Sequence, residues 1–329
     1  MASLWSAFVS YFSAAPAGTL SRHSYAEAER IVLEVLDIYK QLKAMKSLKP
    51  CDEVDGLFER LVDHSILNRY SEVTDLVLQD PKLLEIRSDL RKVCDVAECC
   101  LEFHWADIII GQGESSPEEV FNRLKLFPYF ENYVDLTKLE LSAIYGVRQE
   151  TSPISRVAFL GSGPLPLTSL CLCGVAGDPL QLPGITAPPI SVLNIDIDTS
   201  AISKSKVLCE KLGDRGKRMD FICSDARNPD IDLTEFDVVY LAALVGSTQK
   251  EKEEVLVDVV SRMSENALLV IRSADRLRRL LYPVFDPSSE TVTKYLDICA
   301  VVHPYNHVVN SVVIGRVRRR EMERIHCKL

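Results

Sequence analysis

The segment from Gly161 to Pro166 has the residue types that hold a ligand close to the backbone. It follows a short apolar run, and glycine lets the main chain approach a ligand closely. The dinucleotide-binding fingerprint has its third glycine where this chain has Pro166. Prolines stiffen a turn and lack the N–H donors that a pyrophosphate needs. The turn therefore favours a ligand without a phosphate, although two glycines alone also occur in ordinary tight turns. The residues expected to contact such a ligand are Gly161, Ser162, Gly163 and Pro164.

Three aspartates stand where two neighbouring strands are expected to end. Asp196 and Asp198 close the run that begins at Ser191, and Asp225 follows the run that begins at Met219. Ligands of parallel sheets bind beyond the carboxyl ends of the strands. Asp196 could accept both hydroxyls of a ribose, and Asp225 could accept an adenine amino group. Each aspartate could instead cap the following helix, and that alternative weighs most for Asp198.

The ends of the fourth and fifth expected strands supply candidates for the reacting part of the ligand. Ala242 and Leu244 follow the fourth strand, and Arg272 closes the fifth, where its guanidinium could bind an amino acid carboxylate. Tyr282 is expected either to wall the pocket or to join the core, and Asn310 has no assigned role. A glycine turn, a ribose acid and a base-reading acid, without phosphate donors, predict a pocket for S-adenosylmethionine.

Two patterns along the chain would position these residues. From Tyr25 to about Tyr145, apolar residues recur every three or four positions, which predicts helices. Ser116 and Pro117 are expected to cap and open one of these helices. After residue 150, short apolar runs alternate with helical segments, which is typical of a parallel, doubly wound sheet. The last two strands are expected to close this sheet as an antiparallel hairpin.

The predicted fold class is α/β, with a helical bundle domain followed by a Rossmann-like domain of the class I methyltransferase type. The segment 174–190 is rich in glycine and proline and is expected to be a surface loop. The expected divisions are an N-terminal extension over 1–24, the helical domain over 25–150, the S-adenosylmethionine-binding domain over 151–319 and a basic tail over 320–329.

Composition and charge indicate which partners and which cellular compartment to expect. The chain has 329 residues and a net charge of −9, and its acidic excess lies in residues 1–150. No apolar run is long enough to span a bilayer, and one basic run over 316–324 argues only weakly for nucleic acid. A small-molecule substrate is therefore expected, with no nucleic acid or membrane partner and with the oligomeric state open. Ten cysteines without a CxxC pair predict reduced thiols of a cytoplasmic protein rather than zinc ligands. Organelle targeting by the extension stays open.

Several longer motifs are similar to segments of one enzyme family. They include VAFLGSGPLPLTSL at 157–170, FDVVYLAALVG at 236–246 and LFPYFENYV at 126–134. These motifs, with others between residues 30 and 317, resemble nicotianamine synthase. The resemblance implies transfer of the 3-amino-3-carboxypropyl arm of S-adenosylmethionine rather than its methyl group. Three arms condense into nicotianamine, which contains an azetidine ring and chelates iron and other metals, and 5′-methylthioadenosine is released.

The resemblance also implies the residues that handle the proton. Glu102 in CLEFHWA would accept the proton of the attacking amine, and Tyr133 in FENYVDL would assist it. Taken alone, Glu102 favours a surface position and Tyr133 a core position, and Glu98 is a rival base. No cofactor beyond the substrate S-adenosylmethionine is expected, and no metal ligands, because the metal belongs to the product.

Two alternatives fit the same predicted fold. A small-molecule methyltransferase would release S-adenosylhomocysteine, whereas arm transfer releases methylthioadenosine. A non-catalytic S-adenosylmethionine-binding protein would bind the molecule without turnover. The products formed from S-adenosylmethionine alone would discriminate among the three.

Overall fold

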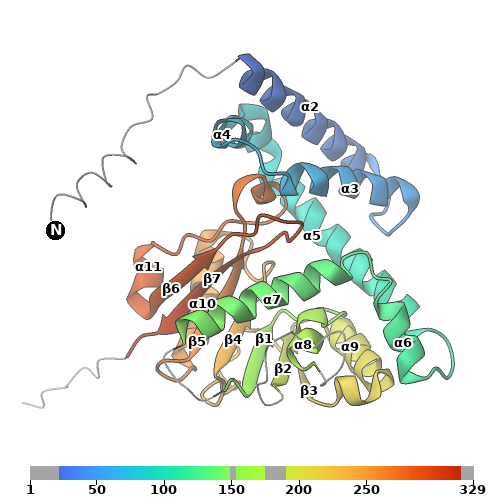
Figure 1. Cartoon of the computed structure of the whole chain (residues 1–329), viewed down its shortest axis with the longest axis vertical. Coiled ribbons are helices and arrows are strands. Elements are labelled where there is room, and N and C mark those ends of the chain that lie inside the picture. The colour runs from blue at the N-terminus through green and yellow to red at the C-terminus, as the bar shows by residue number, and fades with distance from the viewer. Residues whose placement is uncertain (1–21, 149–152, 175–189, 320–329) are drawn as a thin grey trace, which may run out of the picture.

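The computed structural model describes residues 22–148, 153–174 and 190–319. Helices gather at one end of the molecule and a sheet fills the other (Figure 1). The predicted basic tail, nearly all of the predicted loop and most of the predicted extension lie outside the described residues. Residues 22–24 of that extension are already helical, because an amphipathic helix that is docked by its later turns gains an extra turn at little cost. The helices before the sheet are α2 (Arg22–Ala44), α3 (Asp52–Ile66), α4 (Ser71–Gln79), α5 (Pro81–Ile110), α6 (Pro117–Leu124) and α7 (Phe130–Val147).

A seven-stranded sheet follows, with the order β3-β2-β1-β4-β5-β7-β6. Strand β7 runs antiparallel to its neighbours and the other pairs are parallel, so the predicted closing hairpin and the doubly wound sheet are confirmed. The strands are β1 (Arg156–Leu160), β2 (Ser191–Asp196), β3 (Met219–Cys223), β4 (Val238–Leu241), β5 (Leu268–Ser273), β6 (Leu296–Val302) and β7 (Ser311–Val317). The elements between them are α8 (Leu167–Leu172), α9 (Thr199–Lys211), η1 (Gly213–Gly216), α10 (Gln249–Ser261), η2 (Arg276–Leu280) and α11 (Glu290–Tyr295).

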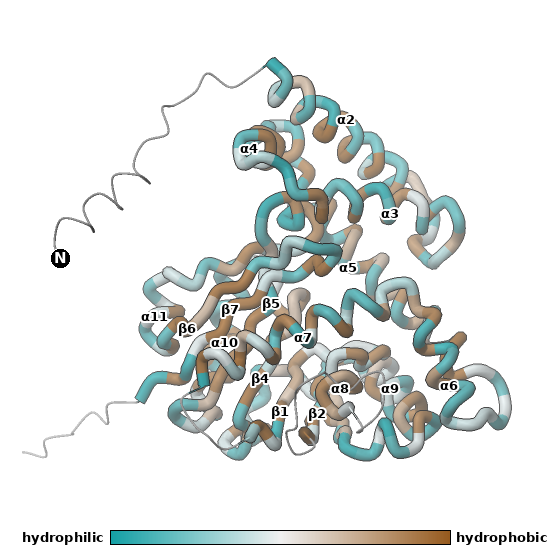
Figure 2. Tube along the Cα trace, viewed as in Figure 1, coloured by the Kyte–Doolittle hydropathy of each residue, from teal (hydrophilic) through white to brown (hydrophobic). Residues whose placement is uncertain are grey.

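Alternation along the strands divides the core into two layers. Val157 and Phe159 of β1 join a cluster with α7, α8 and α9, whereas Ala158 and Leu160 join a second cluster with α10 and α11. Successive strand residues point to opposite faces, so a strand buried on both sides reads as a continuous apolar run. The hydropathy colouring shows these runs along the strands (Figure 2).

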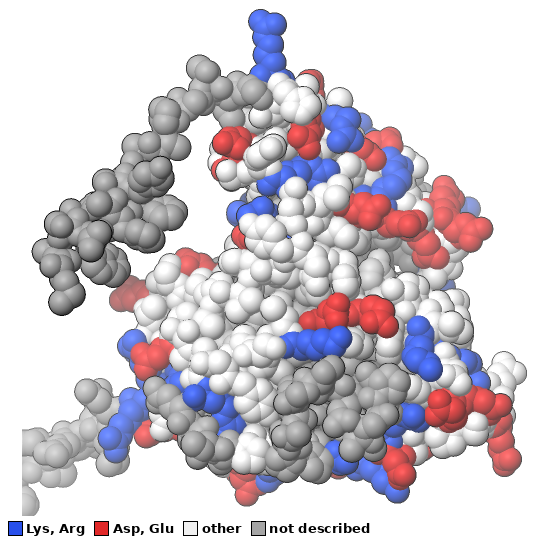
Figure 3. Space-filling model, in the orientation of Figure 1, with Lys and Arg blue, Asp and Glu red and all other residues white. Residues whose placement is uncertain are grey.

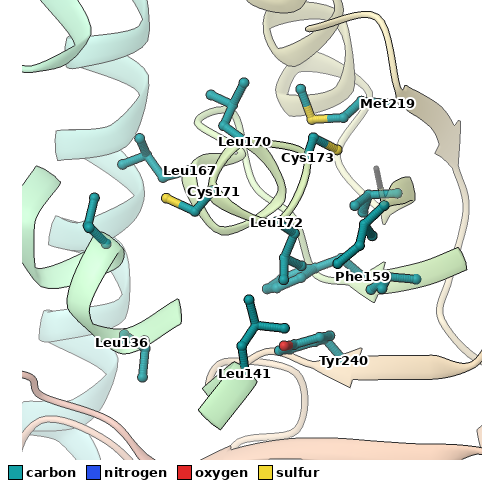
Figure 4. Packing of buried hydrophobic residues seen from close by; sticks show 14 of the residues in the cluster. Leu136, Leu141, Phe159, Leu167, Leu170, Cys171, Leu172, Cys173, Met219 and Tyr240 are labelled. Atoms are coloured by element: carbon teal, nitrogen blue, oxygen red, sulfur yellow. The ribbon is translucent and has the colours of Figure 1, made fainter. Parts of the chain in front are cut away.

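The layer beneath the glycine turn is closely packed. Leu172 of α8 and Leu141 of α7 lie beside the rings of Phe159 and Tyr240 (Figure 4). Those two rings are stacked, with centroids 5.3 Å apart. Aromatic pairs at this separation add to the free energy gained from area burial. The turn that joins β1 to α8 is therefore held on a rigid base.

Helix α5 connects the two ends of the molecule (Figure 1). Its first half, including Leu83 and Leu90, packs in a cluster with α2, α3, α4 and η2. Its last turns pack against the sheet layer through Ile109 and Trp105. Asp80 caps the helix by accepting hydrogen bonds from the backbone of its first turn, and Pro81 occupies the first helical position. The middle of α5 consequently lies at the junction between the two ends.

The predicted start of α6 is confirmed in detail. The hydroxyl of Ser116 accepts from the backbone N–H of Glu119, whose carboxylate accepts from the backbone N–H of Ser116. This reciprocal capping box satisfies two amide groups that a helix otherwise leaves unpaired. Pro117 stands in the first turn, where its missing N–H costs nothing.

Candidate active site

A cavity of about 670 Å³ opens beyond the carboxyl ends of β1, β2 and β4. Every residue that the sequence analysis placed at the ligand lines it. They are Glu102, Tyr133, Gly161, Ser162, Gly163, Pro164, Asp196, Asp198, Asp225, Ala242, Leu244 and Arg272. We call this the first cavity. It lies where an open α/β sheet ordinarily binds its ligand.

Both glycines of the turn are required by close contacts. Gly161 and Gly163 have φ values of 82° and 65°, in the left-handed region that side chains disfavour. A Cβ on Gly161 would lie 2.5 Å from the Val245 side chain, and one on Gly163 would lie 2.7 Å from Oε2 of Glu102. The turn of the sheet and the middle of α5 therefore touch at Gly163 and Glu102.

The three strand-end aspartates make different contacts. Asp198 caps α9, since its Oδ1 accepts from the N–H groups of Ser200 and Ala201, which is the helix-cap alternative. Asp196 accepts from the N–H of Gly163 at 2.8 Å through Oδ2 and from the N–H of Asp198 through Oδ1. A carboxylate oxygen accepts more than one hydrogen bond, so both Asp196 oxygens can still receive ribose hydroxyls.

Asp225 is an ionised acceptor at the far end of the first cavity. Its side chain accepts from the guanidinium of Arg227 at 3.2 Å and from that residue's backbone N–H at 2.8 Å. These hydrogen bonds lower the pKa of Asp225 below its ordinary value. The carboxylate is therefore charged at neutral pH and could accept an amino group.

Arg272 is already paired within the protein. Its Nε and Nη2 donate to the two oxygens of Glu140 on α7 at 2.8 and 3.1 Å, and Nη2 also donates to Oγ1 of Thr168 at 2.7 Å. Burial opposes the charge, but the Glu140 carboxylate raises the pKa of Arg272 above its ordinary value. The sequence predicted that Arg272 binds a ligand carboxylate, and it gave no sign that Glu140 neutralises this guanidinium. Nη1 is left as the nitrogen through which it could reach a ligand carboxylate.

Glu102 is half-buried, and the surface it keeps faces the cavity. Its Oε1 accepts a hydrogen bond from the hydroxyl of Tyr133 at 2.8 Å. Burial, followed by the neighbouring Glu98 carboxylate, raises the pKa of Glu102 to about 8, against the opposing effect of Tyr133. Glu98 lies one helical turn earlier and accepts from the hydroxyl of Tyr282 at 2.8 Å.

A second cavity of about 590 Å³ meets the first at these glutamates. It lies between the helices and the sheet, and six of its lining side chains are aromatic. The residues that line both cavities are Glu98, Glu102, Tyr133 and Asn310. Sequence patterns missed this cavity, because it arises from the packing of α3, α5 and α7 rather than from a motif.

Two further buried polar residues lie at or beside the site, and no sequence motif identified a role for either. Lys252 is buried, and its ammonium donates to the carbonyls of Ala242 and Ala243, which hold the segment after β4. Burial lowers the pKa of Lys252 to about 7. Asn310 is buried at the boundary of the cavities, and its Nδ2 has no hydrogen-bond partner within the described structure.

The described residues also bear on nucleic-acid, metal and membrane sites. Charges of both signs are interspersed on the face that Figure 3 shows, which is unlike a continuous basic surface. Across residues 22–148, 153–174 and 190–319, three or more His, Cys, Asp or Glu side chains never gather closely enough to hold a metal ion. The helices in those ranges are too short or too polar to cross a membrane. The nine cysteines in those ranges are free thiols.

The chain is similar to one family along most of its length. A model of the family described as "Nicotianamine synthase protein" matches residues 24–322. Nicotianamine synthase 2 of Arabidopsis thaliana is 36% identical over 291 residues, which are 88% of this chain and 84% of that relative.

Solved structures share the fold. The crystal structure of MtNAS in complex with MTA and tNA has a TM-score of 0.69 and 21% identity, covering 92% of this chain and 100% of that one. A mutant of MtNAS in complex with S-adenosylmethionine has a TM-score of 0.68 and 22% identity, covering 88% and 98%. The predicted α/β architecture, a helical domain with a Rossmann-like sheet, is thereby confirmed.

The buried Glu140–Arg272 pair predicts a large stability effect. Glu140→Gln should lower the free energy of unfolding by about 3–5 kcal/mol, because the guanidinium stays buried without its carboxylate. The matched control is Asp297→Asn, whose partner Arg318 is 46% exposed and which should cost at most about 1 kcal/mol. Urea denaturation measures both variants. If both variants lose an equally small amount of unfolding free energy, the Glu140 carboxylate is not needed to stabilise the buried charge of Arg272.

Proposed function

The chain belongs to the nicotianamine synthase family, and we propose that it makes nicotianamine by transferring 3-amino-3-carboxypropyl groups from S-adenosylmethionine. The observation that carries the proposal is the Glu102–Tyr133 pair, which stands where the two cavities meet. The first cavity would hold the donor molecule. The second would hold the molecule whose amine attacks, so that this amine reaches the donor beside Glu102.

The first cavity supports binding of the donor through its strand-end residues. Asp196 would accept the ribose hydroxyls, and Asp225 would accept the adenine amino group. The turn from Gly161 to Pro164 would lie against the ligand with its backbone, and Ala242 and Leu244 would flank the sulfur end. Arg272 would receive an amino acid carboxylate through Nη1 and is supported in that position by Glu140.

The reaction is a direct displacement at the sulfonium. An amine nitrogen attacks the arm carbon that is bonded to sulfur, the C–N bond forms as the C–S bond breaks, and methylthioadenosine leaves. The proton of the amine passes to the Glu102 carboxylate. The protein accelerates this step by aligning nucleophile and leaving group and by keeping the amine unprotonated.

The environment of Glu102 suits a proton acceptor. Its pKa of about 8 makes the carboxylate more basic than an exposed glutamate. A sulfonium bound in the first cavity would add a positive charge nearby, which favours the ionised form and brings that pKa towards neutrality. The hydrogen bond from Tyr133 fixes Oε1, while Oε2 lies near the turn at Gly163.

Two other functions would also use the first cavity, but they explain the Glu102–Tyr133 pair less well. A methyltransferase acting on a small molecule would release S-adenosylhomocysteine, and a non-catalytic binding protein would release nothing. We also place the enzyme in the cytoplasm, which the free thiols of the described cysteines support, since reducing compartments keep thiols unpaired.

Glu102→Gln should leave the fold and S-adenosylmethionine binding nearly intact, because the amide keeps the shape of the side chain. Release of methylthioadenosine should fall by about 10²–10⁴-fold, since an amide cannot take the proton. Raising the pH should partly restore the rate as solvent deprotonates the amine. Tyr133→Phe should cost less. Near-normal release by Glu102→Gln at neutral pH would remove Glu102 as the proton acceptor.

Gly163→Ala should slow turnover by about 10–100-fold, because the new Cβ would push Glu102 out of position. It should also cost about 1–2 kcal/mol of stability through its left-handed backbone. Gly113→Ala is the control, with φ at 79° and open space around its Cβ. Steady-state kinetics and denaturation would separate the effects. Turnover lost equally in both variants would mean that the contact with Glu102 is irrelevant.

Asp196→Ala should weaken S-adenosylmethionine binding by about 1.5–3 kcal/mol, the range for hydrogen bonds to a charged group. Asp198→Ala should leave the affinity nearly unchanged, because that carboxylate is occupied in capping α9. Titration calorimetry on both folded variants provides the comparison. An unchanged affinity for Asp196→Ala would exclude that residue from the ribose site.

A further inference from the structure

Glu98 is a second carboxylate where the two cavities meet, and the reaction described above assigns it no role. It lies on the same face of α5 as Glu102, one turn earlier, and lines both cavities. Its Oε2 accepts a hydrogen bond from the hydroxyl of Tyr282 at 2.8 Å. The site thus contains two glutamate–tyrosine pairs rather than one.

The tyrosines of the two pairs differ in the cavities that they line. Tyr133 comes from α7 and lines both cavities, whereas Tyr282 follows η2 and lines the second cavity but not the first. The Glu102 carboxylate touches the turn that forms the wall of the first cavity. The Glu98 pair is therefore oriented towards the second cavity, where the attacking molecule would lie.

Two neighbouring half-buried carboxylates are costly to maintain. Within the described residues, Glu98 has no salt bridge with a lysine or arginine, and the more distant charge of Arg272 offsets only part of the cost of burying the carboxylate. Burial is the main cause that raises the pKa of Glu98 to about 7. A glutamine would keep the shape and the bond from Tyr282 without this cost. An ionisable group at this place is better explained by proton transfer than by stability.

We propose that Glu98, held by Tyr282, is a second proton acceptor, and that it serves a displacement whose attacking amine is lodged in the second cavity. The inference rests on the proposed function. Each product needs several displacements, and every one of them releases a proton. In the step assigned to Glu98, a C–N bond forms, the C–S bond of the donor breaks, methylthioadenosine leaves, and the amine proton passes to the Glu98 carboxylate.

The test compares wild type, Glu98→Gln, Glu102→Gln and Tyr282→Phe, each supplied with S-adenosylmethionine alone. Methylthioadenosine and all amine products are quantified by mass spectrometry over time. Glu98→Gln should form nicotianamine about 10²–10⁴-fold more slowly while an incompletely condensed amine accumulates. The ratio of methylthioadenosine to nicotianamine should then exceed that of wild type. Tyr282→Phe should show the same pattern in weaker form, because the Glu98 carboxylate remains in this variant.

The outcomes separate this proposal from a structural role and from failure of the function itself. Glu98→Gln that matches wild type in rate and product ratio would reduce Glu98 to a structural partner of Tyr282. A fall in methylthioadenosine release as large as that of Glu102→Gln, without any intermediate, would mean that the two carboxylates act as one base, which also overturns the proposal. Wild type that forms no methylthioadenosine would overturn the proposed function and this inference with it. Calorimetric binding of S-adenosylmethionine checks that each variant is folded.

Discussion

The contact between Gly163 and Glu102 is the constraint on which the site depends. A glycine turn from the sheet and a glutamate from the middle of α5 approach so closely that a single added carbon would lie 2.7 Å from Oε2. That approach requires α5 to pack at both of its ends, in the helical cluster through Leu90 and in the sheet layer through Ile109. The strand that leads into the turn is itself packed through the stacked rings of Phe159 and Tyr240. The helical and sheet parts therefore together form the candidate site.

Burial and pairing divide the charged groups of this centre into two kinds. The Glu140–Arg272 pair cancels its own charge with bidentate geometry and stabilises the wall of the cavity. Glu98 and Glu102 have no salt-bridge partner among the described residues, and burial raises the pKa of each, so each carboxylate is a stronger base than an exposed glutamate.

Sequence reasoning could locate the sheet and its ligand edge, because strand ends and glycine turns are local patterns. Asp196 and the turn at Gly161 follow from β1 and β2 alone. The partner of Arg272 could not be found in this way, since Glu140 lies far away along the chain and meets it only through the packing of α7. The burial of Glu102 likewise depends on where α5 crosses the sheet, and helical periodicity alone favoured the surface. The family resemblance supplied that residue, and the second cavity had no local signal.

The proposed reaction transfers the arm of S-adenosylmethionine and leaves its methyl group on sulfur. Incubation with two isotopic forms of the substrate, labelled either in the methyl group or in the aminocarboxypropyl carbons, tests it directly. With arm transfer, the methyl label stays in methylthioadenosine and the arm label appears in the amine product. Methyl label in an acceptor, with S-adenosylhomocysteine as the companion product, would contradict it.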